Sequence, residues 1–176
     1  MINEIIEMLE DGKVGAVFGG SPEMGSRALG HRSIIADPRL VKGKDIVNKV
    51  KNREWFRPFA ASVLVEEASN WFDMGKLEDS PWMLFAVPVL EDKRYIVPAV
   101  IHVDGTCRVQ TVSKDLGVYY DIIKAFFNST GVPMLLNTSL NLAGMPLIHT
   151  KEEARSMLHN SSLDFVYFVD DNKVET

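Results

Sequence analysis

Three basic side chains within seven positions are the sharpest candidate for chemistry in this sequence. Lys51, Arg53 and Arg57 lie in one short segment, and Pro58 then leads into an apolar run. The planar fork of arginine binds phosphate oxygens in pairs, and lysine adds a compact charge. We therefore expect these three residues to converge as the catalytic cations of a site for a polyphosphate or an acyl phosphate. The alternative is that Arg53 and Arg57 form ion pairs with Glu54 and other surface carboxylates.

Four short polar side chains follow a second apolar run. They are Asn137, Thr138, Ser139 and Asn141, in a segment that continues to Gly144. Ligands of open α/β sheets bind beyond strand ends, and small amides and hydroxyls leave room for a ribose and its phosphates. We expect the four residues to face the same cavity as the three cations, although about 80 residues separate the two segments. A turn that caps its own backbone is the alternative.

A glycine-punctuated segment from Gly19 to Gly30 follows the first predicted strand. It lacks the Lys-Ser/Thr pair of a phosphate loop, because Ser26 and Arg27 stand in that place. Its glycines still allow a ligand to approach the backbone closely. We expect Arg27 and Arg32 to bind the cofactor by clamping its phosphates, or to seal an interface; the clamp is favoured for Arg27 and the interface for Arg32. A simple tight turn is the alternative interpretation of the segment.

Arg108 lies on an alternating segment that is typical of a strand. Burying an arginine is costly unless it meets an anion or a carboxylate, so Arg108 either contacts the ligand or pairs with Asp104. The lone cysteine, Cys107, is expected to be a packed, reduced thiol. The four histidines are scattered, and neither HExxH nor paired-cysteine spacing occurs, so we expect no protein-bound metal.

Alternating helices and strands must position these side chains. Apolar spacing and capping signals predict an α/β fold, with a mixed twisted sheet and flanking helices in one domain spanning residues 1–176. The expected helices cover 2–11, 42–51, 68–72, 118–130 and 150–159. The expected strands and extended segments cover 14–18, 33–36, 59–65, 83–89, 97–103, 108–112, 132–136 and 165–169.

Charge is unevenly distributed along the 176 residues. Residues 25–58 hold nine basic and three acidic side chains, a charge of +6. Because the net charge of the chain is −5, the remaining residues together carry −11. A local cationic segment on an acidic protein favours a small anionic ligand and makes nucleic acid an improbable partner. The apolar runs are too short for a membrane span, and an acidic start does not resemble a signal peptide. We expect a cytoplasmic protein.

Taken in order, five segments resemble the C-terminal domain of O-carbamoyltransferases of the nodulation-protein NodU/CmcH type. The segments are Gly25–Arg39, Val50–Ala60, Ser80–Met83, His102–Val112, and Thr130–Pro133 continued by Leu136–Asn141. The resemblance runs from about Val14 to Val169.

This resemblance implies a YrdC-like fold that binds ATP, with Mg²⁺ brought by the nucleotide, together with carbamoyl phosphate. It also implies that the domain forms a carbamoyl-adenylate, which a separate Kae1-like domain or subunit transfers to a hydroxyl acceptor. A non-catalytic nucleotide-binding or assembly module that has lost its partner domain is the alternative. A tRNA-modifying YrdC enzyme is a third possibility, and the −11 outside the central segment counts against it.

Overall fold

A mixed sheet organises the computed structural model, which describes residues 1–25 and 27–176. Ser26, part of the glycine segment discussed above, lies outside the described residues. Within the described residues, eight strands form one sheet in the order β4-β5-β3-β6-β2-β1-β7-β8. Their bounds are β1 Gly15–Phe18, β2 Arg32–Ala36, β3 Ala60–Leu64, β4 Phe85–Pro88, β5 Thr106–Val112, β6 Met134–Ser139, β7 Phe165–Phe168 and β8 Lys173–Glu175.

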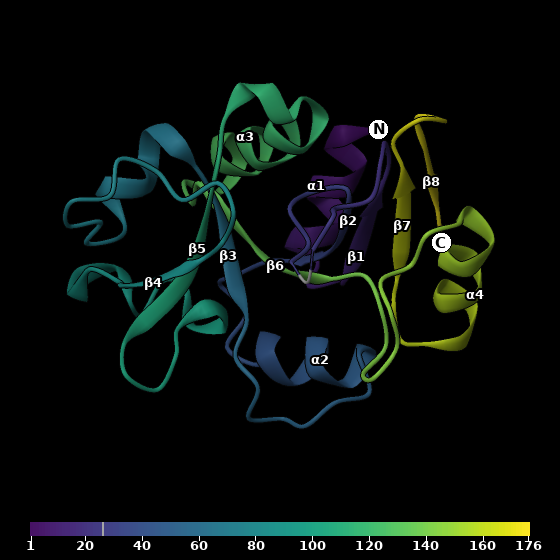
Figure 1. Ribbon diagram of the computed structural model, residues 1–176, viewed down its shortest axis with the longest axis horizontal. Coiled ribbons are helices and arrows are strands. Elements are labelled where there is room, and N and C mark those ends of the chain that lie inside the picture. Colours follow the sequence, from purple (N-terminus) through teal and green to yellow (C-terminus); the bar gives the residue numbers. More distant parts are fainter. Residues whose placement is uncertain (26) are drawn as a thin grey trace.

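Helices cover both faces of this sheet. Figure 1 shows α1 (Ile2–Glu10) and α3 (Val118–Thr130) on one side and α2 (Gly43–Val50) on the other, while α4 (Lys151–Asn160) packs beside β7. Tyr119, Ile122 and Phe126 of α3 are buried at helical spacing, as the sequence predicts. Thr150 and Glu153 form a capping box at the start of α4. No helix in the described part of the chain is long and apolar enough to cross a bilayer.

The prediction of an extended segment at 97–103 is wrong in part. Pro98–Val100 forms a single 3₁₀ turn, outside the sheet. Val97, Ala99 and Val100 are fully buried there, and Gly43 at the start of α2 lies directly against Ala99. These apolar side chains are therefore buried by packing against a helix, and strand pairing is not needed to remove them from water. The short edge strand β8 was not predicted, because its three residues carry no apolar alternation.

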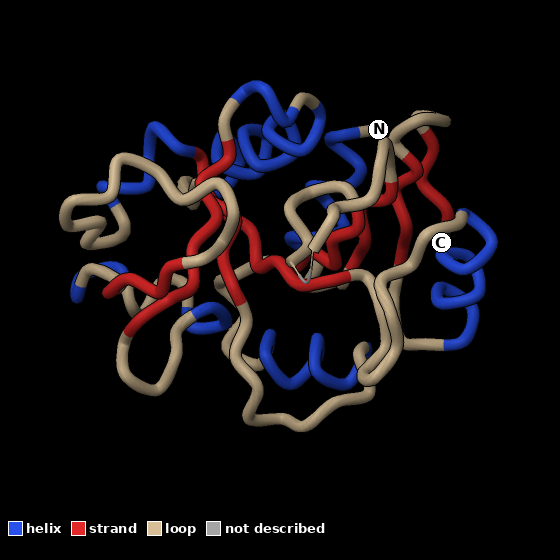
Figure 2. Tube along the Cα trace, viewed as in Figure 1, coloured by secondary structure: helices blue, strands red, loops and turns tan. Residues whose placement is uncertain are grey.

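Strand direction explains why two distant segments meet. β3 and β6 are antiparallel neighbours, with Ala60 opposite Asn137. The start of β3 therefore lies beside the end of β6. Two loops therefore emerge at the same ends of these central strands (Figure 2). The loop at 51–59 joins α2 to β3, and the loop at 140–149 follows β6.

Candidate functional site

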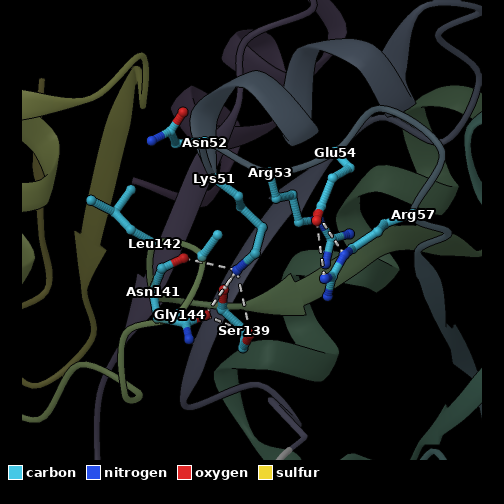
Figure 3. Close-up of a pocket in the computed structure, with 10 residues that line it drawn as sticks. Lys51, Asn52, Arg53, Glu54, Arg57, Ser139, Asn141, Leu142 and Gly144 are labelled. Carbon is cyan, nitrogen blue, oxygen red and sulfur yellow. Dashed lines mark hydrogen bonds and ion pairs between the residues drawn. The ribbon is translucent and has the colours of Figure 1, made fainter.

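A pocket of about 720 Å³ lies between these two loops. Figure 3 shows basic side chains from the first loop facing the polar backbone and side chains of the second. The lining residues are Lys51, Asn52, Arg53, Glu54, Arg57, Ser139, Asn141, Leu142, Ala143 and Gly144. The structure thus brings Lys51, Arg53, Arg57, Ser139 and Asn141 together.

Lys51 is the bridge between the loops. Its side chain is buried, and its Nζ donates to the carbonyl oxygens of Ser139 and Asn141 and to Asn141 Oδ1, the latter two at 2.9 Å. Every one of these acceptors is a neutral oxygen. Burial, reinforced by the positive charge of Arg53, lowers the pKa of Lys51 from its usual 10.5 to about 7. The ammonium therefore holds the second loop in place while its own charge is uncompensated.

Arg53 and Arg57 differ in their partners. Arg57 Nε pairs with Glu54 at 2.7 Å, and both side chains are half exposed, so the surface ion-pair alternative holds for Arg57. Arg53 instead donates from Nε to Asn48 Oδ1 at 2.5 Å and lies 4.3 Å from the ring centre of Phe59. Burial, together with the nearby positive charges of Arg57 and Arg108, lowers the pKa of Arg53 from 12.5 to about 10. Arg53 thus offers a charge that its neutral hydrogen-bond partners do not cancel.

Two further arginines extend this positive region away from the pocket. Arg108 of β5 is partly buried, and its Nε has no hydrogen-bond partner within the described residues. Asp104 does not pair with it, since that carboxylate accepts from the N–H and hydroxyl of Thr106 at 3.0 and 2.7 Å. Burial and the charge of Arg27 lower the pKa of Arg108. Neither Arg108 nor Arg27 lines the 720 Å³ pocket; Arg27 lines a separate hollow with Trp82 and Leu84.

Asn137 and Thr138 do not line this pocket, which corrects the expectation that all four polar residues face it. Asn137 is fully buried, and its Nδ2 donates to Ser62 Oγ at 2.7 Å and to the carbonyl of Ala28 at 3.0 Å. Thr138 lies inside the strand, opposite Ile34 of β2. Side chains alternate between the two faces of a strand, so Thr138 points away from the face that Asn137 and Ser139 share. Asn137 lies deeper in the strand and binds Ser62 and Ala28, so Ser139 at the end of β6 and Asn141 beyond it are the two that line the pocket.

Arg32 is buried and holds the glycine segment. Its Nη1 donates to the carbonyls of Gly19 and His31, both at 2.8 Å, and its Nη2 donates to Gly20 at 3.2 Å. The guanidinium also lies 3.7 Å from the ring centre of Phe18. Burial lowers the pKa of Arg32. A side chain committed to these backbone carbonyls faces neither a ligand nor a partner surface, so the expected interface role is not supported by its geometry.

Several supporting residues were missed from the sequence. Glu23 Oε1 accepts from the N–H groups of Leu29 and His31 at 2.7 and 2.8 Å and so fixes the glycine segment from within. Gln110 donates to the carbonyl of Leu29 at 2.8 Å, and Asn48 binds Arg53. A lone carboxylate among glycines was the available signal for Glu23. The other two partners depend on contacts across the fold.

A second, apolar pocket of about 270 Å³ adjoins the first and shares Asn141 and Leu142 with it. It lies between the 140–149 loop and α4. Met145, Pro146, Leu147, Ile148 and Met157 supply its apolar lining, and His149 and Ser156 are among its polar residues. A polar, cationic compartment therefore opens beside an apolar one, an arrangement suited to a ligand with an anionic end and a flat, weakly polar end.

Comparison with solved structures defines the fold class. A crystal structure of full-length HypF in the phosphate- and nucleotide-bound form superposes with a TM-score of 0.67 at 19% identity, over 96% of this chain and 24% of that one. A variant of Pyrococcus abyssi Sua5 gives 0.62 at 12% identity, over 96% and 52%, and Escherichia coli YciO gives 0.57 at 15%, over 99% and 86%. The fold is the YrdC-like α/β fold, which confirms the fold class expected from the sequence.

Sequence comparison then gives the family. Residues 6–174 match the carbamoyltransferase C-terminus family, and the chain belongs to it. Nodulation protein NolNO of Sinorhizobium fredii is 46% identical over 161 residues, which cover 90% of this chain and 24% of that protein. Nodulation protein NolO of Bradyrhizobium diazoefficiens is 45% identical over 156 residues, covering 85% and 28%. The chain therefore spans about a quarter of the length of these curated relatives.

Proposed function

We propose that the 720 Å³ pocket binds the phosphates of ATP together with carbamoyl phosphate, and that this chain forms a carbamoyl-adenylate as part of an O-carbamoyltransferase. The observation that carries the proposal is the placement of Lys51 and Arg53 against the Ser139–Asn141 turn; in the part of the chain that the structure describes, neither cation pairs with a carboxylate. Family membership supplies the carbamoyl chemistry, and the ATP requirement would keep the reaction in the cytoplasm.

Charge development explains what the residues would contribute. Water would first hydrolyse carbamoyl phosphate, breaking its acyl–phosphate bond to give carbamate and inorganic phosphate. When a carbamate oxygen then attacks the α-phosphorus of ATP, the bond to pyrophosphate breaks and negative charge moves onto the leaving group. Cations fixed before the reaction stabilise that charge without reorganising. Lys51 and Arg53 fit this role because hydrogen bonds hold both side chains in place, to the half-buried Asn141 for Lys51 and to the buried Asn48 for Arg53.

The adjoining apolar pocket supports a nucleotide as the ligand. An adenine ring would be taken out of water among Met145, Pro146 and Ile148, while polar groups such as Ser156 offer hydrogen bonds to its edge. Asn141 lies on the boundary between the two pockets, where a ribose would join base and phosphates.

The pocket residues fit phosphates better than a protein-bound metal. Glu54 is the carboxylate among the lining residues, and Arg57 already pairs with it. Mg²⁺ would therefore be bound through the phosphates of ATP, where it would neutralise part of their charge.

A Kae1-like domain or subunit is the proposed recipient of the adenylate. Large apolar side chains are exposed at two places on the surface. Trp55 and Phe56 lie on the loop at 51–59, and Trp82 and Leu84 lie beside Arg27 in the separate hollow described above. Such side chains on a folded protein favour a further protein surface that covers them. The length of the relatives leaves about three quarters of their chains to supply it.

Pyrophosphate release tests the proposal. The purified chain is incubated with ATP, Mg²⁺ and carbamoyl phosphate, and pyrophosphate release or ATP–pyrophosphate exchange is followed, with and without a Kae1-like partner. We expect pyrophosphate only when both substrates are present. ATP binding without pyrophosphate release in either condition would instead favour the non-catalytic nucleotide-binding module.

Arg53→Ala should weaken ATP binding. Loss of a charge-assisted contact costs about 1.5–3 kcal/mol, or roughly a 10- to 150-fold loss of affinity measured by isothermal titration. Arg94→Ala is the matched control, because Arg94 is also partly buried and donates to a backbone carbonyl, that of Val89, outside both pockets. Unchanged ATP affinity in Arg53→Ala would remove Arg53 from the site.

A further inference from the structure

The side chain of Asn48 holds the loop that carries Arg53. Asn48 lies on α2 and is only 2% exposed. Its Nδ2 donates to the carbonyls of Trp55 and Arg57 at 3.0 and 3.2 Å, and its Oδ1 accepts from Arg53 Nε at 2.5 Å. Both amide hydrogens and the amide oxygen are therefore used on this one loop.

The loop has few other anchors. Residues 52 and 54–58 are exposed, and Arg53 is intermediate. Its backbone bonds close the end of α2, where Arg53 N–H donates to the carbonyl of Asn48 at 3.1 Å, and a turn in which Arg57 N–H donates to Glu54 at 3.2 Å. The tip of the loop is thus tied to the buried part of the protein through the amide of Asn48. An arginine positioned by exposed backbone alone would lose affinity to side-chain and loop motion.

We propose that Asn48 is a positioning residue for anion binding: it holds Arg53 at the pocket without cancelling its charge. Asn48 does not line the pocket and acts through Arg53 and the carbonyls of Trp55 and Arg57. The proposal rests on the proposed function for the nature of the ligand.

The chemistry of the amide explains why a carboxylate would not replace it. An aspartate at this position would accept from Arg53 more strongly, yet it would have no hydrogens for the two carbonyls. Its negative charge would also neutralise Arg53, so the pocket would lose one effective positive charge. The neutral amide both anchors the loop and leaves the guanidinium available to an anion.

The test measures pyrophosphate binding by isothermal titration at several salt concentrations, in the full chain and in Asn48→Asp. We expect at least a tenfold loss of affinity and a weaker dependence on salt, because one charge is cancelled. Asn128→Asp makes the same chemical change on the exposed surface of α3, across the sheet from α2, and should bind as the wild type does. If Asn48 served only to stabilise the fold, Asn48→Asp would have a lower melting temperature, and the salt dependence of its pyrophosphate binding would equal that of the wild type.

Asn48→Ser provides a second, uncharged variant if the aspartate does not fold. It removes most of the anchoring bonds and should lose affinity several-fold while keeping the salt dependence of the wild type. If the wild type binds pyrophosphate and Asn48→Asp binds it equally well, the positioning role is overturned and the proposed function stands. Where only Asn48→Ser folds, unchanged binding in that variant has the same meaning. Failure of the wild type to bind pyrophosphate would overturn both.

Discussion

Lys51 illustrates how one buried charge links two distant loops. Its Nζ binds oxygens of residues 88 and 90 positions further along the chain. Arg53 is equally constrained, through Asn48 and Phe59. At the scale of single residues, neutral groups hold Lys51 and Arg53 in place, so the charges of these two cations remain available, whereas Arg57 pairs with Glu54.

The charge state of Lys51 should make nucleotide binding depend on pH. With a pKa near 7, Lys51 loses its proton as the pH rises through neutrality, so ATP affinity should fall between pH 6 and 8.5. Lys51→Met should bind more weakly and lack this component of the pH dependence. Titrations of ATP at several pH values measure both. Lys44→Met is the control, since Lys44 lies on α2, the helix that immediately precedes Lys51, and donates to the carbonyl of Ile101, away from the pocket.

Linkage gives the opposite sign for stability. Between about pH 7 and 10.5 the unfolded chain binds more protons at Lys51 than the folded chain does. The contribution of Lys51 therefore increases the free energy of unfolding as the pH rises through that window. Urea unfolding across the same range, compared with Lys51→Met, isolates that contribution. Equal pH profiles in the two proteins would contradict the lowered pKa.

At the scale of elements, a buried polar cluster attaches the glycine segment to the sheet. Ser62 of β3, Gln110 of β5 and Asn137 of β6 bond to one another. Asn137 and Gln110 then donate to the carbonyls of Ala28 and Leu29. Because these backbone oxygens are away from water, each needs a partner.

Asn137→Leu should therefore destabilise the fold. The leucine fills a similar space but leaves the Ala28 carbonyl without its donor, at about 1–3 kcal/mol for a buried group left unsatisfied. Ser62 and Gln110 lose their bonds from the amide but still bond to each other. Urea unfolding measures the loss. Asn70→Leu, at an exposed position, should change the free energy of unfolding by about 0.5 kcal/mol or less. Similar effects of the two substitutions would mean that the buried cluster does not stabilise the segment.

At the scale of the whole molecule, the exposed aromatic side chains are a property of the surface around the pockets. Trp82 is 65% exposed, and it borders the same hollow as Arg27. An exposed side chain contributes little to the stability of the chain that carries it. Its proposed contribution is to the contact with a Kae1-like partner.

Trp82→Ala should separate adenylate formation from transfer. In the chain alone, pyrophosphate release and the melting temperature should stay as in the wild type. In the enzyme completed by a Kae1-like partner, carbamoyl transfer to the acceptor should fall. Tyr95→Ala, which removes another exposed aromatic side chain, is the control. Undiminished transfer in Trp82→Ala would place the partner on another surface.

The sequence by itself determined most of the elements, the family resemblance and the types of residue at the pocket. Helical spacing, capping and apolar runs are local signals, so α3, α4 and the central strands could be predicted within a few residues. Lys51, Arg53, Ser139 and Asn141 were singled out because cations and short polar groups beside strands suit phosphates, and the structure brings them together.

Only the tertiary structure decided which candidates are used elsewhere. The sequence suggests Asn137 as a ligand contact and Arg32 as an interface residue or phosphate clamp, yet both are buried and bind backbone carbonyls of the glycine segment. Asn48 carries no sequence signal, because its role depends on a loop that folds back over α2. The physical reason is that burial and hydrogen-bond partners arise from strand pairing and packing between residues far apart in the chain, whereas residue type and spacing report only local structure.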